Sequence, residues 1–163
     1  QSTGGIPTWG PVSGNVVFPA TQVASGDVNI LDDYEEGTWT PVIGGVGGES
    51  GQTYDIQIGT YTKIGRLVMV FGQVRLTAKG TITGGIAIKG LPFAAAAGQV
   101  GPHSLLWVSL ATNWVNIIAV LEASDTFMTV YGSSAAATGN ITQLATADIG
   151  NASRFDLSAS YHI

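Results

Sequence analysis

Residues 66–76, with the sequence RLVMVFGQVRL, constrain the fold more than any other part of the chain. The first half is apolar at every position from 67 to 71, so a strand here presents apolar side chains on both of its faces. The second half alternates between polar and apolar residues. The chain shows no long helical pattern that would cover such a strand. We therefore expect it to be buried by a second sheet or by a partner subunit.

The two-residue period of β-strands continues through the rest of the chain. The closing residues 154–163 alternate without a break, and apolar positions also alternate over 54–60. Further apolar runs between turn residues predict strands at 82–88, 104–111, 114–122 and 126–131. About eight short strands of this kind predict an all-β protein, an antiparallel β-sandwich or jelly roll.

The composition limits the possible partners. Only 10% of the residues are charged, against about 25% in ordinary soluble domains. No apolar run reaches the ~18–20 residues of a membrane helix, so we expect burial between subunits and no membrane insertion. The formal net charge of −5 argues against a nucleic acid partner. The chain has no cysteine, which excludes disulfides and thiolate metal sites.

Residues 1–37 differ from the rest of the chain. They are rich in Gly, Pro, Ser and Thr, and Pro7 and Pro11 disfavour both helix and central strand. Residues 16–22 could form a short edge strand. We predict an extended connector over 1–37 and a β-sandwich domain over 38–163. Because the chain begins at Gln1 without an initiator methionine, we expect it to be part of a longer protein.

An acidic cluster, DDYEE, ends the connector and contains Asp32, Asp33, Glu35 and Glu36. Carboxylates can bind Ca²⁺, but the spacing of an EF-hand is absent and adjacent acidic side chains point in divergent directions. A charged, solvated joint is the favoured interpretation, with no metal. Five of the six basic residues lie between positions 63 and 89. This asymmetry allows the acidic cluster to dock on a basic face of its own subunit or of a neighbour. The alternative is that these charges are scattered over a solvated surface.

Catalytic patterns are weak in this sequence. Sequence neighbours rarely form the facing carboxyl pair of a glycosidase, and the remaining acids are scattered. The two histidines, His103 and His162, lack a G-x-S-x-G elbow to work with. Copies of His162 could gather on a trimer axis around a metal, although a surface histidine is the simpler interpretation. We expect neither an enzyme nor a cofactor.

One tryptophan suggests a sugar-binding site. Trp114 follows a turn and is flanked by Asn113 and Asn116, and an indole face beside amides is a common way to bind sugars. With the following segment 124–133, the predicted ligand-binding residues are Asn113, Trp114, Asn116, Asp125 and Tyr131. The alternative for Trp114 is a place in the core. Trp107 is expected in the core, and Trp39 is expected to be a packing anchor at a strand start.

Four segments resemble a known module in the same order along the chain. They are FPATQVASGDVNILDDYEEGTWTP (18–41), YTKIGRLVMVFGQVRL (61–76), IKGLPF (88–93) and LSASYHI (157–163). These stretches are similar to the C-terminal β module of tail-fibre and related receptor-binding tail proteins of bacteriophages and prophages. Residues 94–150 do not share in the resemblance.

The resemblance implies a homotrimeric domain at the distal end of a phage tail fibre, located on the virion. Its partners would be the rest of the fibre and a bacterial cell-surface polysaccharide or lipopolysaccharide. One alternative is a module that trimerises and caps the fibre without touching a receptor. A second is part of a polysaccharide depolymerase, although catalytic β-helices of that kind are usually much longer.

Overall fold

The computed structural model describes residues 33–98, 101–134 and 140–163, and within these it is built almost wholly of strands. The strands are β1 (Tyr34–Trp39), β2 (Val42–Gly45), β3 (Gly48–Ser50), β4 (Thr53–Ile64), β5 (Leu67–Ala78), β6 (Thr81–Thr83), β7 (Ile86–Lys89), β8 (Gly101–Val108), β9 (Asn116–Leu121), β10 (Phe127–Ser133), β11 (Thr142–Gln143) and β12 (Arg154–His162). One 3-10 turn, η1 (Thr146–Asp148), is the only helical element in the described part. The predicted all-β class is confirmed. No helix there is long and apolar enough to cross a membrane.

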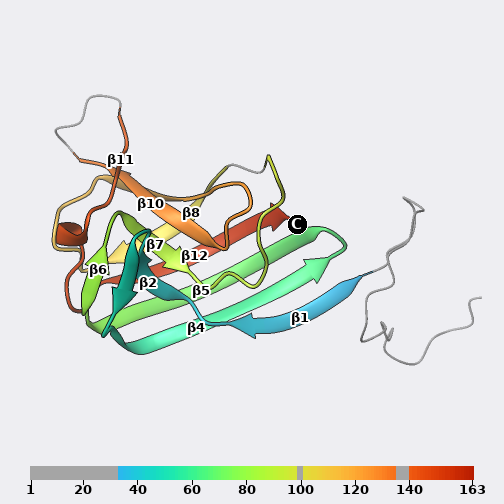
Figure 1. Ribbon diagram of the computed structural model, residues 1–163, viewed down its shortest axis with the longest axis horizontal. Coiled ribbons are helices and arrows are strands. Elements are labelled where there is room, and N and C mark those ends of the chain that lie inside the picture. The colour runs from blue at the N-terminus through green and yellow to red at the C-terminus, as the bar shows by residue number, and fades with distance from the viewer. Residues whose placement is uncertain (1–32, 99–100, 135–139) are drawn as a thin grey trace, which may run out of the picture.

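Most of these strands form one curled antiparallel sheet in the order β1-β4-β5-β12-β8-β9-β10-β7-β2, with β11 added beside β10. β8 pairs with β12 through residues 104–108 and with β9 through residues 101–103, so it passes from one half of the sheet to the other. We call β1, β4, β5 and β12 with the end of β8 the first sheet, and the start of β8 with β9, β10, β11, β7 and β2 the second sheet. β3 and β6 form a separate two-stranded sheet. Figure 1 shows β2, β7 and β10 lying over β5 and β12. The predicted antiparallel sandwich is thus confirmed.

The two sheets share one hydrophobic core because their strands alternate in the predicted way. In β12, Phe155, Leu157 and Tyr161 are buried, and Val68 and Val70 are buried beside them in β5. Each fully buried side chain of this size stabilises the fold by roughly 1.5–3 kcal/mol. The period of two in the sequence therefore located the core face of the first sheet correctly.

Trp39 is a packing anchor, as predicted. Its indole is buried across the paired glycines Gly59 and Gly72, where a Cβ atom would come within 2.6 Å of the indole. The Trp39 Nε1 donates hydrogen bonds to the carbonyl oxygens of Thr60 (3.2 Å) and Phe71 (3.0 Å). Because the two glycines have no side chains, the indole lies directly on the backbone and covers the inner side of β4 and β5.

The double-sided burial expected for β5 is wrong within a single chain. Val68 and Val70 face the second sheet and are fully buried, but Leu67, Met69 and Phe71 point to the opposite side and are exposed. The second sheet covers only one face of β5, because it packs against the concave side alone. The other face of the first sheet is open in the described structure.

The acidic cluster belongs to the sheet from Tyr34 onward. Residues 34–37, predicted to be connector, form the first part of β1, where Tyr34 pairs with Ile64 and Glu36 with Thr62. The polar side chains of these residues give no apolar period of two, because β1 is an edge strand with little burial, so the sequence did not indicate a strand there. Residues 1–32 of the predicted connector, which include Asp32 and the predicted strand at 16–22, lie outside the described residues.

The expected docking of acidic residues on basic ones is found within the chain. Asp33 forms an ion pair with Lys63 of β4, and both side chains are buried. Glu35 accepts a hydrogen bond from the hydroxyl of Tyr61. The interpretation as a wholly solvated joint is therefore wrong for Asp33, because β1 brings that carboxylate against the inner side of β4.

Candidate functional site

The residues predicted to bind a ligand fall in two places. Asn113 and Trp114 lie in the β8–β9 loop, and Asn116 is the first residue of β9. Tyr131 in β10 pairs with Ile118, two residues along β9 from Asn116, so Asn116 and Tyr131 share one sheet face. Asp125 lies in the turn between β9 and β10, at the opposite end of both strands. The structure thus groups four of the five residues around one end of β9 and separates Asp125 from them.

Trp114 is half-buried and packs at the margin of the core. Its ring lies over Gly132, where a Cβ atom would approach the indole within 2.6 Å. The Trp114 Nε1 is buried and has no hydrogen-bond partner among the described residues. One face of this indole is therefore occupied by packing against β10, which leaves less of it for a ligand than the sequence suggested.

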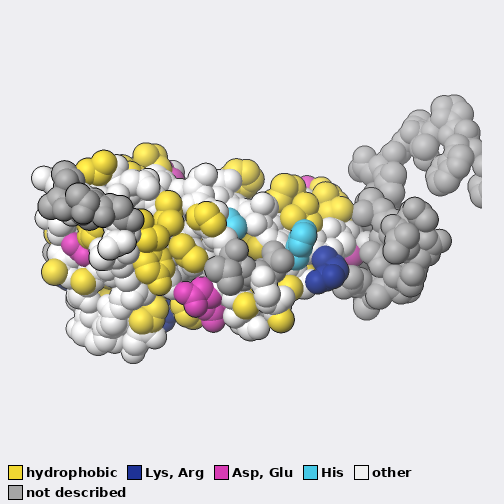
Figure 2. Space-filling model, turned by 90° about the horizontal axis from the view of Figure 1, so that it is seen from above, with side chains coloured by type: hydrophobic (Ala, Val, Ile, Leu, Met, Phe, Trp, Pro, Cys, Tyr) yellow, Lys and Arg dark blue, Asp and Glu magenta, His cyan; other side chains and the backbone are white. Residues whose placement is uncertain are grey.

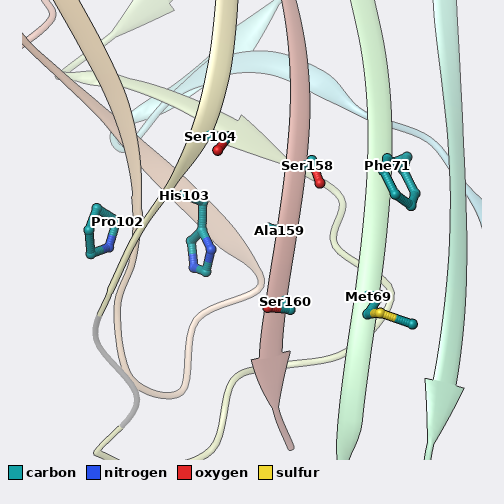
Figure 3. A pocket seen from close by; sticks show the side chains of 8 residues that line it. All are labelled: Met69, Phe71, Pro102, His103, Ser104, Ser158, Ala159 and Ser160. Carbon is teal, nitrogen blue, oxygen red and sulfur yellow. The ribbon is translucent and has the colours of Figure 1, made fainter.

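Two hollows lie on either side of β8, at the point where it changes sheets. β8 is paired with β12 only as far as Ser104 and with β9 only as far as His103. The diverging strands leave a β8–β9 hollow of about 420 Å³, lined by Pro102, His103, Ser104, Leu105, Trp107, Asn116, Ile117 and Ile118. A β8–β12 hollow of about 390 Å³ is lined by Met69, Phe71, Pro102, His103, Ser104, Ser158, Ala159 and Ser160. Figure 3 shows the second of these, with His103 and Ser104 on one side and Met69 and Phe71 across β12.

The β8–β9 hollow combines an aromatic surface with hydrogen-bonding groups. Trp107 is half-buried and lines the hollow together with Asn116. Ser104 also lines it, but the strand register places the Ser104 side chain on the opposite face of β8 from Trp107. Burial lowers the pKa of His103 below its ordinary value of 6.5, so the imidazole is neutral at pH 7. A neutral imidazole offers one donor and one acceptor. An indole surrounded by such groups suits a sugar ring, whose apolar face stacks while its hydroxyls form hydrogen bonds.

Sequence reasoning missed three of these four residues. Trp107 was assigned to the core, and the structure does pack it against the core, but its position at the divergence of β8 and β9 leaves part of it accessible. His103 was weighed only as a catalytic residue, and Ser104 was not considered. Only Asn116 was predicted. The sequence signal that could have indicated this site is Gly101-Pro102 directly before an apolar run. A proline there predicts irregular pairing at the start of the strand, because it has no backbone N–H to donate.

The described acidic groups do not line either of the two hollows. Asp156 lines an adjoining hollow together with Ser104 and Ser158. Asp156 is ion-paired with Arg154, and Asp55 with Arg75, whose hydrogen bond lowers the pKa of the Asp55 carboxyl. Among the described residues no three His, Asp or Glu side chains are grouped so as to hold a metal ion.

Comparison with known proteins shows a similarity of fold. The crystal structure of the Dettilon tailspike protein (gp208) superposes on this chain with a TM-score of 0.61 and 16% sequence identity. The superposition covers 79% of this chain but 24% of the tailspike chain. No protein-family model matches the sequence, and no curated protein matches it significantly. This chain therefore has a fold like that of one part of a tailspike protein.

Proposed function

We propose that this chain is a receptor-binding domain of a bacteriophage tail fibre or spike and that it binds a bacterial surface glycan in the β8–β9 hollow. The observation that carries the proposal is the fold, which over most of this chain is similar to part of a tailspike protein. The resemblance of residues 18–41, 61–76, 88–93 and 157–163 to tail-fibre modules supports the same conclusion. In this proposal the domain belongs to the virion and is joined to the rest of the tail appendage as a homotrimer.

The lining of the hollow defines how the glycan would be held. Trp107 provides the stacking surface, Asn116 forms hydrogen bonds with sugar hydroxyl groups, and the neutral His103 accepts or donates one hydrogen bond. The net charge of −5 disfavours strongly anionic polymers through long-range repulsion. A neutral stretch of surface polysaccharide, or of the carbohydrate part of lipopolysaccharide, is the matching ligand.

The domain binds its glycan without cleaving it in this proposal. Glycosidase chemistry needs two carboxyl groups facing each other across the sugar. The absence of carboxylates from the linings of both hollows supports a binding function over that of a depolymerase. The alternative of a capping module predicts an assembled protein with no affinity for cells or glycans.

The test is binding of the labelled protein to a panel of bacterial strains and to an array of neutral bacterial glycans. Asn116→Ala removes a hydrogen-bonding group from the hollow at an exposed position and is expected to weaken binding about tenfold. Asn113→Ala is the matched control, because Asn113 is exposed nearby but does not line the hollow.

The possible results separate the hypotheses. Loss of binding with Asn113→Ala but not with Asn116→Ala would move the site to the β8–β9 loop and keep the function. Release of reducing ends from a bound polysaccharide would show a depolymerase. A correctly folded protein that binds no strain and no glycan would contradict the receptor-binding proposal and favour the capping module.

A further inference from the structure

The convex face of the first sheet is unusually apolar. We call it the outer face and define its apolar members by their side chains, which are large, exposed and directed away from the core: Ile58, Ile64, Leu67, Met69, Phe71, Leu106 and Val108. Ile58, Phe71 and Leu106 are 61%, 60% and 58% exposed. Figure 2 shows hydrophobic side chains at the surface with few charged ones between them.

The strand register places these residues on one face in two groups. Ile64 of β4 pairs with Leu67 of β5, and Ile58 and Phe71 of the same two strands line one hollow. β12 lies between β5 and β8, and its outward side chains are polar: Arg154, Asp156, Ser158, Ser160 and His162. Five apolar side chains therefore lie together on β4 and β5, and the two on β8 lie beyond a row of polar residues.

We propose that the outer face binds a second copy of this chain, with Phe71 at the centre of the contact. The seven side chains together expose on the order of 600 Å² of apolar surface, most of it in the group on β4 and β5 around Phe71. With the surrounding polar residues, the face approaches the ~800 Å² that each partner contributes to a standard interface. Its aliphatic composition suits protein packing rather than sugar binding, which needs hydrogen-bonding groups around an aromatic surface.

The charges on this face support association with a like surface. Arg75 is already paired with Asp55, and Arg154 with Asp156. A second copy can cover these two pairs without leaving a charge that has no partner, a situation that would cost several kcal/mol. Glu36, at the β1 edge of the same face, is hydrogen-bonded to the Tyr34 hydroxyl and has to stay at the solvated rim of the contact. Exposed apolar surface of this extent marks an interaction site and favours aggregation when it is left uncovered. A second copy of the chain is synthesised together with the first, so it is the one partner that is always available to cover the outer face.

The inference is tested by the mass of the intact chain in solution, and it does not depend on glycan binding. The wild type is expected to sediment as an oligomer over a dilution series, and Phe71→Asp is expected to raise the dissociation constant at least tenfold. Val115→Asp is the matched control, because Val115 is 65% exposed but lies in the β8–β9 loop. A monomeric wild type, or an oligomer unchanged by Phe71→Asp, would overturn the proposal.

A second measurement guards against misfolding of the aspartate variant. The chain has no cysteine, so single cysteines can be placed with Phe71→Cys, Leu106→Cys and Val115→Cys. Maleimide labelling is expected to be slow at positions 71 and 106 in the oligomer, to rise on dilution, and to be fast at 115 throughout. Equal rates at all three positions would contradict the inference. If the wild type is monomeric and glycan alone protects position 71, the face belongs to the ligand instead.

Discussion

The buried ion pair between Asp33 and Lys63 is the contact that fastens the start of β1 to the sheet, and its removal should be costly. The side chains of Lys63 and Asp33 are only 5% and 9% exposed. The Lys63 ammonium also lies 5.7 Å from the centre of the Phe93 ring. Lys63→Met keeps the apolar stem but leaves a buried carboxylate without its partner, which is expected to cost about 3–5 kcal/mol. For a chain of this length, 3 kcal/mol corresponds to a fall in Tm of about 6–12 °C.

A double-mutant cycle separates the pair from its surroundings. Asp33→Asn together with Lys63→Met removes both charges, and the coupling free energy is expected to be about 2 kcal/mol or more. The assay is urea unfolding followed by tryptophan fluorescence, with all variants at one protein concentration so that the proposed self-association does not differ between samples. The exposed pair Arg75–Asp55 is the control, and its coupling should be indistinguishable from zero. Equal couplings for the two pairs would refute the argument that burial makes the first pair important.

Three further predictions follow from packing and titration. Gly72→Ala should lower the free energy of unfolding by about 1–3 kcal/mol, because the added methyl group would meet the Trp39 indole at 2.6 Å. Gly101→Ala is the control, because a methyl group there meets open space and should leave the free energy of unfolding unchanged. Calorimetry of both variants tests this prediction. Because the pKa of His103 is lowered in the folded chain, the unfolded chain binds this proton more tightly, and the free energy of unfolding should fall as the pH drops below about 6.5. His103→Gln should flatten that part of the pH profile, measured by urea unfolding. Burial raises the pKa of Tyr54 and Tyr161 to about 12, so spectrophotometric titration should show that they ionise at higher pH than ordinary tyrosines. Above about pH 10 only the unfolded chain loses these two protons, so the free energy of unfolding should decline as the pH rises further.

The sequence predicted the strands whose side chains alternate and missed those whose positions depend on distant contacts. The alternation in 154–163 correctly identified Phe155, Leu157 and Tyr161 as inward-facing. β1 was partly missed, because an edge strand with acidic side chains carries no apolar period. The crossing of β8 between sheets could not be predicted, since it depends on the different points at which β12 and β9 stop pairing with it. The candidate site lies at that crossing, so most of it was missed as well.

The two faces of β8 allow recognition and assembly to be separate properties of one domain. None of the apolar residues of the outer face lines the β8–β9 hollow, whereas Met69 and Phe71 do line the β8–β12 hollow. Association through the outer face would cover the second hollow, including the Pro102, His103 and Ser104 that it shares with the first, and would leave Trp107 and Asn116 of the first accessible. A monomeric Phe71→Asp protein should then keep the affinity of a single site for a short glycan but bind cells much more weakly, because several linked sites raise avidity by 10²–10⁴-fold. Asn116→Ala should show the reverse, with an unchanged mass and a weaker single site. If instead the two variants lose affinity for the short glycan equally, recognition and assembly share one surface, and the assignment of the β8–β9 hollow as an independent site is wrong.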